Sequence, residues 1–459
     1  MLLLACSCNF LKVDNIGKST IESYFAEISS LEPAVNGLYN LTYSVIDKYY
    51  IAYEEIAGDC IVLSPNAEGW QKCQDYKLES SDEISVLGYL WKYGYEAINN
   101  ANQILKYAPK LRKEFPDEYV ITDKAMGNAY FIRALTHLYL CSVYGQNYTF
   151  TADASHLGVI NMDHIPSLSE TIKRSSCKIV YQQIISDLKA AIKIFPSSAD
   201  YSSQYFANPA ACHALLARVY LYMADYKNAI IEANQALSSR DLVSREAYRN
   251  MFVSREPKND ECYLRINGKK QGSSLRSLFY YQEPQARPSS KVMSLLTSDD
   301  VRSTLFTYKD GTTNIVCKYN CEDNDLIENL YYSPVVIRAS EMYLIRAEAN
   351  CALGNLSLAA DDVKALQARA LGKKPADVDL SYSNSEELEM LIEQERIKEL
   401  CFEGHRFMDI ARRHKSVERP SDNTSEVKTL SYPDYRFILQ IPSVEIEANP
   451  NMQQNPTIN

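Results

Sequence analysis

Apolar residues recur at every third or fourth position along most of the chain, which is the spacing of a helix that buries one face. The clearest stripe follows Ser81 and Asp82, two residue types suited to cap the start of a helix. Its members are Ile84, Leu87, Trp91, Tyr95, Ile98 and Leu105. Residues 125–144 and 177–194 keep the same period. We therefore expect a mostly α fold, with Trp91 in its core.

Two segments combine a pair of helical patterns with small residues at the positions where the two helices would touch. They span residues 214–237, with a break near Asp225, and residues 343–366. This arrangement is typical of a tetratricopeptide unit, two antiparallel helices joined by a short turn. One such unit cannot bury its own apolar face, so several must stack. The pattern predicts a tetratricopeptide-like helical repeat scaffold over about residues 20–240 and 334–415.

The helical pattern breaks over about residues 241–333. Residues 262–266 have the pattern of a short strand, and residues 306–319 that of a hairpin, because they contain an Asp-Gly pair that favours a tight turn. We expect this insert to be irregular and loop-rich, with a small β-sheet or hairpin packed against the repeats. Insert and repeats together would form a single domain over residues 20–459.

The densest pattern of opposite charges lies in residues 395–413. Its charged members on the helical repeat are Glu395, Arg396, Glu399, Glu403, Arg406, Asp409 and Arg412. The three Glu are spaced by four residues and share one face. A glycosidase needs two carboxyl groups flanking the sugar, roughly 5–9 Å apart, but carboxylates on one helix face approach from the same side. The spacing favours a paired charge network that holds the helix, with a helical glycoside hydrolase acting through Glu399 or Glu403 as the alternative.

The same segment, ERIKELCFEGHRFMDIARR, resembles the C-terminal signature of the SusD/RagB family of outer-membrane nutrient-binding lipoproteins. Three further blocks are similar to the family's motifs and follow the same order. They lie around Trp91, at residues 334–349 and at residues 441–456. Together the four blocks span nearly the whole chain.

The resemblance implies a SusD-like domain that works at the cell surface. Such a protein binds an oligosaccharide and delivers it to a SusC-like TonB-dependent transporter in the outer membrane, without catalysis and without a cofactor. The RagB branch of the family implies a peptide cargo as the alternative. A protein-interaction scaffold also stays open, because tetratricopeptide units often bind peptides.

The N-terminus has the composition of the end of a lipoprotein signal. Small Ala5 precedes Cys6, which we expect to carry a lipid anchor, and Cys8 after Ser7 is the alternative. The apolar region before Cys6 is short for a signal, so we expect residues 1–19 to be a signal remnant and a tether. A lipid on this segment would hold the protein at the outer membrane.

Composition and motif content argue against several classes of function. The formal charge is −10 and there is no long basic run, which argues against nucleic-acid binding. None of the common catalytic motifs occurs and the six His are scattered, so we expect neither a metal site nor a cofactor. The twelve Cys include no CxxC pair, and the candidate disulfides are Cys60 with Cys73 and Cys317 with Cys321.

Sugar recognition needs an aromatic face beside planar polar side chains. Two loop-like segments, residues 54–80 and 267–300, offer this mixture. Trp70 is the most prominent residue in them, because it lies outside any apolar stripe. The candidate ligand-binding residues are Asp59, Asn66, Trp70, Tyr76, Tyr280 and Tyr281.

Overall fold

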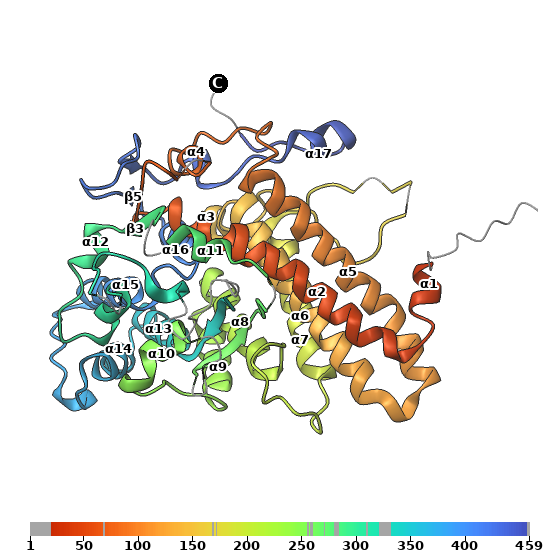
Figure 1. Ribbon diagram of the computed structural model, residues 1–459, viewed down its shortest axis with the longest axis horizontal. Coiled ribbons are helices and arrows are strands. Elements are labelled where there is room, and N and C mark those ends of the chain that lie inside the picture. The colour runs from red at the N-terminus through yellow and green to blue at the C-terminus, as the bar shows by residue number, and fades with distance from the viewer. Residues whose placement is uncertain are drawn as a thin grey trace, which may run out of the picture.

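The computed structural model of the protein describes residues 20–456, apart from residues 68, 168, 171, 255–256, 258–259, 270, 280–283, 309–310 and 321–331. Helices dominate this part of the chain, as the apolar period predicts (Figure 1). None of the helices within it is long and apolar enough to cross a membrane. Of the candidate lipidation, ligand-binding and disulfide residues, five lie outside the described residues: Cys6, Cys8, Tyr280, Tyr281 and Cys321.

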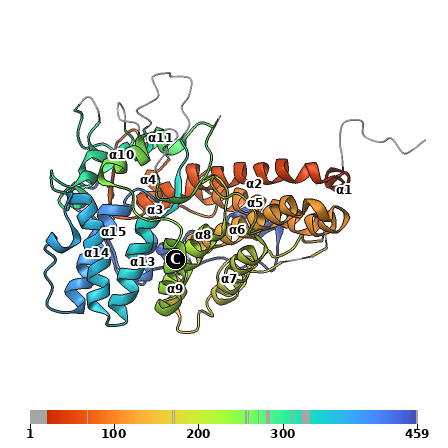
Figure 2. The same cartoon turned by 90° about the horizontal axis from the view of Figure 1, so that it is seen from below.

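Four long helices form one half of the molecule. α2 (Leu31–Val45) packs on both α5 (Val86–Glu114) and α6 (Tyr119–Tyr144), and α7 (Cys177–Ile194) packs on α6. Figure 2 shows α2 as the outermost of these helices and α7 on the opposite side of α6. The half is therefore a layered bundle whose apolar stripes face each other.

The stripe in α5 is buried as predicted. Leu87, Trp91 and Ile98 are at most 2% exposed, so Trp91 is a core residue. The helix begins later than Ser81 and Asp82 suggest, because Ser85 is its cap: the Oγ of Ser85 accepts a hydrogen bond from the backbone N–H of Leu87. Ile84 precedes this cap and is exposed, so its place in the predicted stripe is wrong.

Two antiparallel helix pairs form the core of the other half and confirm the tetratricopeptide-like repeat. They are α8 (Pro209–Tyr222) with α9 (Tyr226–Leu237), and α13 (Ala339–Ala352) with α14 (Leu356–Leu371). α9 packs on α13, and α15 (Ser385–Leu400) packs on α13 and α14. Ala229, Ala233 and Ala359 are fully buried. Small side chains at these sites let the helices approach closely, as the sequence predicts.

The region between the two parts of the repeat scaffold is irregular. The predicted strand is present as β2 (Cys262–Arg265), which pairs antiparallel with β4 (Val335–Arg338). The predicted hairpin is present only next to its turn, where Thr307 and Thr313 form an antiparallel bridge and the N–H of Tyr308 donates to the Thr312 carbonyl at 2.8 Å. The residues on either side form 3₁₀ turns instead, at Val301–Phe306 and Cys317–Tyr319. These turns bury Arg302 and Lys318 against acidic groups, which a two-stranded ribbon facing solvent would not do.

The remaining elements are short. The helices are α1 (Ile21–Tyr24), α3 (Ile51–Ile56), α4 (Gln71–Gln74), α10 (Arg245–Val253), α11 (Ser274–Phe279), α12 (Ser290–Met293), α16 (Arg406–Arg412) and α17 (Ser443–Ala448). The strands are β1 (Ile61–Leu63), which pairs with β3 (Ala286–Pro288), and β5 (Val417–Glu418), which pairs with β6 (Thr429–Leu430).

The cysteines of the described residues are packed as small apolar side chains. Cys60 and Cys73 are buried free thiols, so this candidate pair does not form a disulfide. Cys317 is also buried, and its Sγ–H donates to the Thr307 carbonyl at 3.6 Å. Within the described residues, no group of three His, Cys, Asp or Glu side chains is arranged to hold a metal ion.

Candidate functional site

The helix that begins with α2 continues into α3 through a π-helical turn, Ile46–Tyr50. A π turn adds one residue to a helical turn and is frequent at functional sites. This one carries Asp47, Lys48 and Tyr49, which line a pocket together with residues of α11 and the start of α4. Figure 1 shows α3 and α11 side by side at this place. The π turn is the centre of the candidate site.

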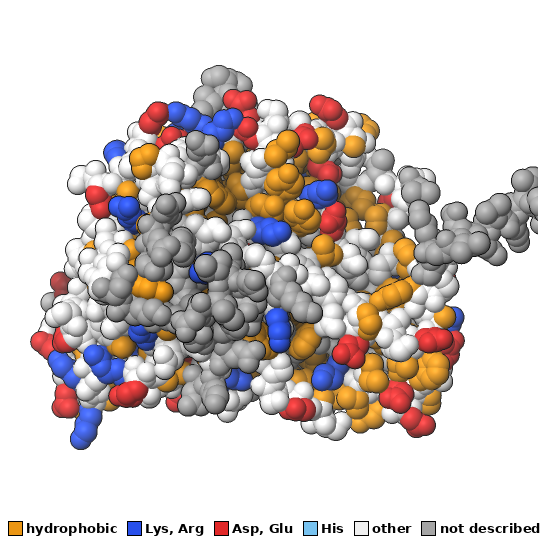
Figure 3. Space-filling view, viewed as in Figure 1, with side chains coloured by type: hydrophobic (Ala, Val, Ile, Leu, Met, Phe, Trp, Pro, Cys, Tyr) orange, Lys and Arg blue, Asp and Glu red, His pale blue; other side chains and the backbone are white. Residues whose placement is uncertain are grey.

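Three tyrosines form an aromatic patch beside the π turn. The ring centroid of Tyr49 lies 5.6 Å from that of Tyr89 and 6.0 Å from that of Tyr93, with angles of 27° and 12° between the ring planes. Tyr89 and Tyr93 lie 6.0 Å apart on successive turns of α5. All three side chains are partly exposed. Figure 3 shows hydrophobic side chains gathered on this face over α3 and the start of α5. We call Tyr49, Tyr89 and Tyr93 the tyrosine patch.

A pocket of about 260 Å³ adjoins the patch. Its lining residues are Asp47, Lys48, Tyr49, Ala52, Trp70, Ser274, Ser277, Leu278 and Gln285. This volume approaches the lower end of small-molecule sites, roughly 300 Å³. Tyr49 belongs to both the patch and the pocket, and Trp70 supplies a second aromatic side chain. The combination of rings with hydroxyl, amide and charged groups suits a polyhydroxylated ligand.

Asp47 fixes one wall of this pocket. Its Oδ1 accepts a hydrogen bond from the Ser273 hydroxyl at 2.7 Å, and its Oδ2 accepts one from the backbone N–H of Ser274 at 2.6 Å. Ser274 is the first residue of α11, so the carboxylate ties α11 to the π turn. Asp47 is fully buried, and burial raises its pKa to about 6 against the effect of the two hydrogen bonds.

The residues predicted from the sequence do not all lie together. Trp70 lines the pocket, and Asn66 is exposed in the turn after β1. The Tyr76 hydroxyl donates to the Ala57 carbonyl at 2.5 Å and accepts from Arg419, so this ring faces the interior. We leave Tyr76 out of the proposed contacts.

Asp59 is fully buried in the described structure. Its carboxylate lies 2.7 Å from Nε of Arg406 and 2.5 Å from Nζ of Lys291. Burial alone would raise the pKa of Asp59, but these two cations lower it well below its usual range. Asp59 is therefore an internal ion-pair partner, and we do not propose that it contacts a ligand.

Sequence reasoning missed the tyrosine patch. Tyr89 and Tyr93 lie two residues before and after Trp91, and a helix turns about 100° per residue. Both tyrosines therefore point away from the buried stripe, at about 160° from Trp91. This spacing is a signal that the sequence does contain. The membership of Tyr49 in the patch cannot be predicted from the sequence, because it depends on how α2 packs on α5.

Glu399 lies at the centre of a buried ion network. Its carboxylate lies 3.0 Å from Nη1 of Arg302, 2.7 Å from Nη1 of Arg338 and 2.8 Å from Nη2 of Arg369. Burial alone would raise the pKa of Glu399, but the three guanidinium groups lower it well below its usual range. Glu395 joins the same network through Arg302 at 2.5 Å.

Glu403 is held in the same way by Arg338 and Lys318, at 2.8 and 2.6 Å. Burial works against the charged form, yet the two cations lower the pKa of Glu403 to about 2. A general acid must carry a proton near the working pH. Glu399 and Glu403 are ionised at neutral pH and enclosed by cations, so their geometry does not favour the hydrolase alternative.

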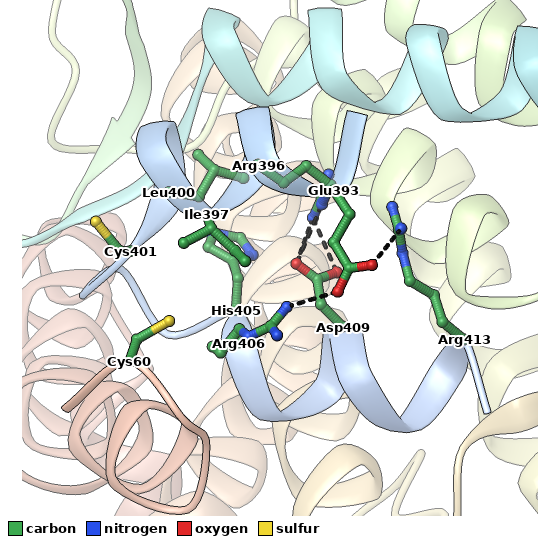
Figure 4. A pocket seen from close by; sticks show the side chains of 10 residues that line it. All are labelled: Cys60, Glu393, Arg396, Ile397, Leu400, Cys401, His405, Arg406, Asp409 and Arg413. Carbon is green, nitrogen blue, oxygen red and sulfur yellow. Dashed lines mark hydrogen bonds and ion pairs between the residues drawn. The ribbon is translucent and has the colours of Figure 1, made fainter. Parts of the chain in front are cut away.

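Figure 4 shows the second part of the network, between α15 and α16. Arg396 contacts Asp409 at 3.0 Å, and Nη1 of Arg406 lies 3.2 Å from Glu393. Arg412 of α16 reaches Glu348 of α13 at 2.5 Å. The cavity among the residues drawn has a volume of about 10 Å³, close to the space for one water molecule. The charged segment therefore holds α15, α16 and α13 together.

Comparison with models of known protein families shows which family the chain belongs to. A family model described as "SusD family" matches residues 212–457, more than half of the chain. The chain belongs to the SusD family. A second family model, described as "Starch-binding associating with outer membrane", matches residues 10–221. The two matches overlap in α8 and together cover almost the whole sequence.

One relative and two solved structures resemble the chain over at least 94% of its length. SusD-like protein P2 of Formosa agariphila is 24% identical, over 99% of this chain and 97% of its own. A crystal structure of a SusD superfamily protein from Bacteroides thetaiotaomicron is 24% identical with a TM-score of 0.83, and covers 94% of this chain and 100% of its own. A putative sugar binding protein from Bacteroides vulgatus is 25% identical with a TM-score of 0.81, over 94% of this chain and 98% of its own.

The SusD-family fold thus includes the irregular region as well as the helical halves. The description of the second family model associates its members with the outer membrane. The predictions of a SusD-like protein and of a mostly α, tetratricopeptide-like fold are confirmed.

Proposed function

We propose that this protein is a lipid-anchored, cell-surface member of the SusD family that captures an oligosaccharide and passes it to a SusC-like TonB-dependent transporter. The observation that carries the proposal is the position of Tyr49, which belongs both to the tyrosine patch and to the pocket that Trp70 lines. A sugar can place its C–H face on an aromatic ring while the polar groups of the pocket bond its hydroxyls.

The comparisons support a glycan as the cargo. The description of one matching family model refers to starch binding, and one similar structure is that of a putative sugar binding protein. We propose Trp70 and the tyrosine patch as the central contacts. Asn66 precedes Trp70 in the chain, and Tyr280 and Tyr281 follow the pocket residue Leu278 closely, so these three remain proposed contacts.

The cargo is tested by titrating the purified protein with panels of oligosaccharides and of peptides in a calorimeter. Saturable binding of one glycan class is expected. Binding of peptides alone would overturn the sugar proposal and favour the RagB-like alternative. Release of shorter products from a labelled glycan by the purified protein would contradict a pure binding role.

The anchor and the transporter need separate tests. Mass spectrometry of protein from the membrane fraction is expected to find an acylated N-terminal Cys6, or Cys8 as the alternative. Purification from outer membranes in mild detergent is expected to yield a TonB-dependent transporter with the protein. Recovery of soluble proteins without any transporter would instead support the interaction scaffold.

A further inference from the structure

Two lysines border the tyrosine patch. Lys48 precedes Tyr49 in the chain, lines the pocket and is partly exposed. Lys92 is exposed on α5, and its Nζ lies 5.8 Å from the ring centroid of Tyr93. Neither ammonium group lies within 4.0 Å of a carboxylate of the described residues. The chain as a whole has a formal charge of −10, so two lysines beside its aromatic surface with no carboxylate partner among the described residues are a local exception.

The acidic groups closest to these lysines in the sequence do not neutralise them by direct contact. The carboxylate of Asp47 is buried and accepts hydrogen bonds from Ser273 and Ser274. Glu96 follows Lys92 by one turn of α5 and is exposed, but it forms no ion pair with Lys92 within 4.0 Å. No carboxylate within the described part of the chain therefore takes up the donors of either ammonium group, and these donors can bind a ligand.

We infer that the site selects anionic oligosaccharides, with sugar faces on the tyrosine patch and the anionic substituents beside Lys48 and Lys92. The inference rests on the proposed glycan-binding function and names its ligand class. A carboxylate of a uronic acid and a sulfate ester share the required chemistry, an oxyanion that accepts charge-assisted hydrogen bonds from an ammonium group. A neutral glycan would stack on the same rings without these bonds.

The test compares charged oligosaccharides with their own neutral forms by calorimetry. Uronate oligomers are paired with their methyl esters, and sulfated oligosaccharides with their desulfated counterparts. The charged member of a pair is expected to bind more tightly at about 0.01 M ionic strength. The difference is expected to shrink at about 1 M salt, where the screening length falls from roughly 30 Å to roughly 3 Å. The two kinds of pair distinguish carboxylate from sulfate.

Lysine variants test which residues cause the preference for the charged glycan. Lys48→Gln and Lys92→Gln are each expected to weaken binding of the charged glycan about twofold to fivefold, the size of an exposed ion pair. The neutral form is expected to lose less affinity than the charged form in both variants, and Lys48→Arg is expected to keep the charged preference. The matched control is Lys106→Gln, because Lys106 is also exposed on α5 and lies 5.0 Å from the ring centroid of Tyr107, away from the patch.

The outcomes separate this inference from the proposed function. Equal affinity for the charged and neutral forms, or Lys48 and Lys92 variants that behave like Lys106→Gln, would overturn the anionic preference and leave glycan binding standing. Binding of peptides with no glycan bound would overturn both. A preference for the charged form that disappears in the Lys48 and Lys92 variants supports the inference.

Discussion

The rings of Tyr49 and Tyr93 lie nearly parallel, with 12° between their planes and 6.0 Å between their centroids. Tyr49 comes from the π turn that follows α2, and Tyr93 comes from α5. The packing of α2 on α5 brings the two rings together at the edge of the pocket. The aromatic surface is thus a product of helix packing rather than of a single loop.

Removing one ring of this patch is expected to weaken glycan binding. Tyr49→Ala loses a stacking face, worth about 0.5–1.5 kcal/mol, so the dissociation constant should rise roughly twofold to tenfold. Tyr49→Phe keeps the ring and should lose less. The measurement is calorimetric titration of the best glycan, together with thermal unfolding to show that each variant is folded.

Tyr107→Ala is the matched control for the tyrosine patch. Tyr107 is also partly exposed on α5 and stacks on an aromatic ring, that of Phe25 at 5.0 Å, but it lies outside the patch. Its loss should leave glycan affinity unchanged. Equal weakening by Tyr49→Ala and Tyr107→Ala would contradict a specific role for the patch.

Neutralising the central carboxylate of the ion network is expected to destabilise the protein. Glu399→Gln leaves Arg302, Arg338 and Arg369 without their shared counter-charge in the interior. Breaking a buried pair in this way costs about 3–5 kcal/mol. Urea unfolding followed by circular dichroism measures the loss.

Glu389→Gln provides the comparison on the same helix. The Glu389 side chain is 49% exposed and lies 4.0 Å from Arg413. The substitution should therefore change the free energy of unfolding by no more than about 0.5 kcal/mol. A Glu399→Gln variant as stable as Glu389→Gln would show that the network does not hold the fold.

His137 is expected to make stability depend on pH. Its Nδ1–H donates to the Arg133 carbonyl at 3.0 Å, and its Nε2 accepts from the N–H of Met162 at 3.2 Å, so the neutral ring satisfies both groups. Burial, together with the charge of Arg133, lowers the pKa of His137 from 6.5 to about 3. Between these values the unfolded chain binds a proton that the folded chain does not. The free energy of unfolding should therefore fall as the pH is lowered from about 6.5 towards 3.

Urea titrations at a series of pH values test whether the free energy of unfolding falls as the pH is lowered. His137→Gln should flatten the pH dependence in that window. His164→Gln is the control, because His164 is largely exposed and its neighbours Asp163 and Glu170 raise its pKa. If the free energy of unfolding of His137→Gln depends on pH as strongly as that of the wild type, the buried His137 ring is not the cause of the pH dependence.

A glycine in α6 is expected to be required by close packing. A Cβ added at Gly127 would lie 2.5 Å from Cε1 of Phe195, whose ring is buried at the end of α7. Gly127→Ala should therefore lower the free energy of unfolding by about 1–3 kcal/mol. Gly37→Ala in α2 meets nothing within 4 Å and should raise it by about 0.5–1 kcal/mol. Urea unfolding measures both variants. A free energy of unfolding that changes in the same direction in both would contradict the packing argument.

The helical architecture was predictable because it depends on short-range periodicity. The α5 stripe, the α8–α9 pair and the α13–α14 pair all follow from residues within a few turns of each other. The hairpin predicted over residues 306–319 is limited to the bridge between Thr307 and Thr313. Arg302 and Lys318 on either side are held instead by Glu395 of α15 and by Glu403 just after it. The local turn preference predicted the turn, but the long-range charge network decides the conformation of the residues that flank it.

The family resemblance, the repeat scaffold and the charged segment at residues 395–413 could be predicted from the chain alone, because each depends on the spacing of residues that are neighbours in the sequence. Which polar and aromatic residues face solvent depends on the tertiary structure. It placed Asp59 inside beside Arg406, and brought Tyr49 onto Tyr89 and Tyr93 at the surface. Contacts between residues far apart in the chain depend on how helices pack, and local sequence patterns do not predict that packing.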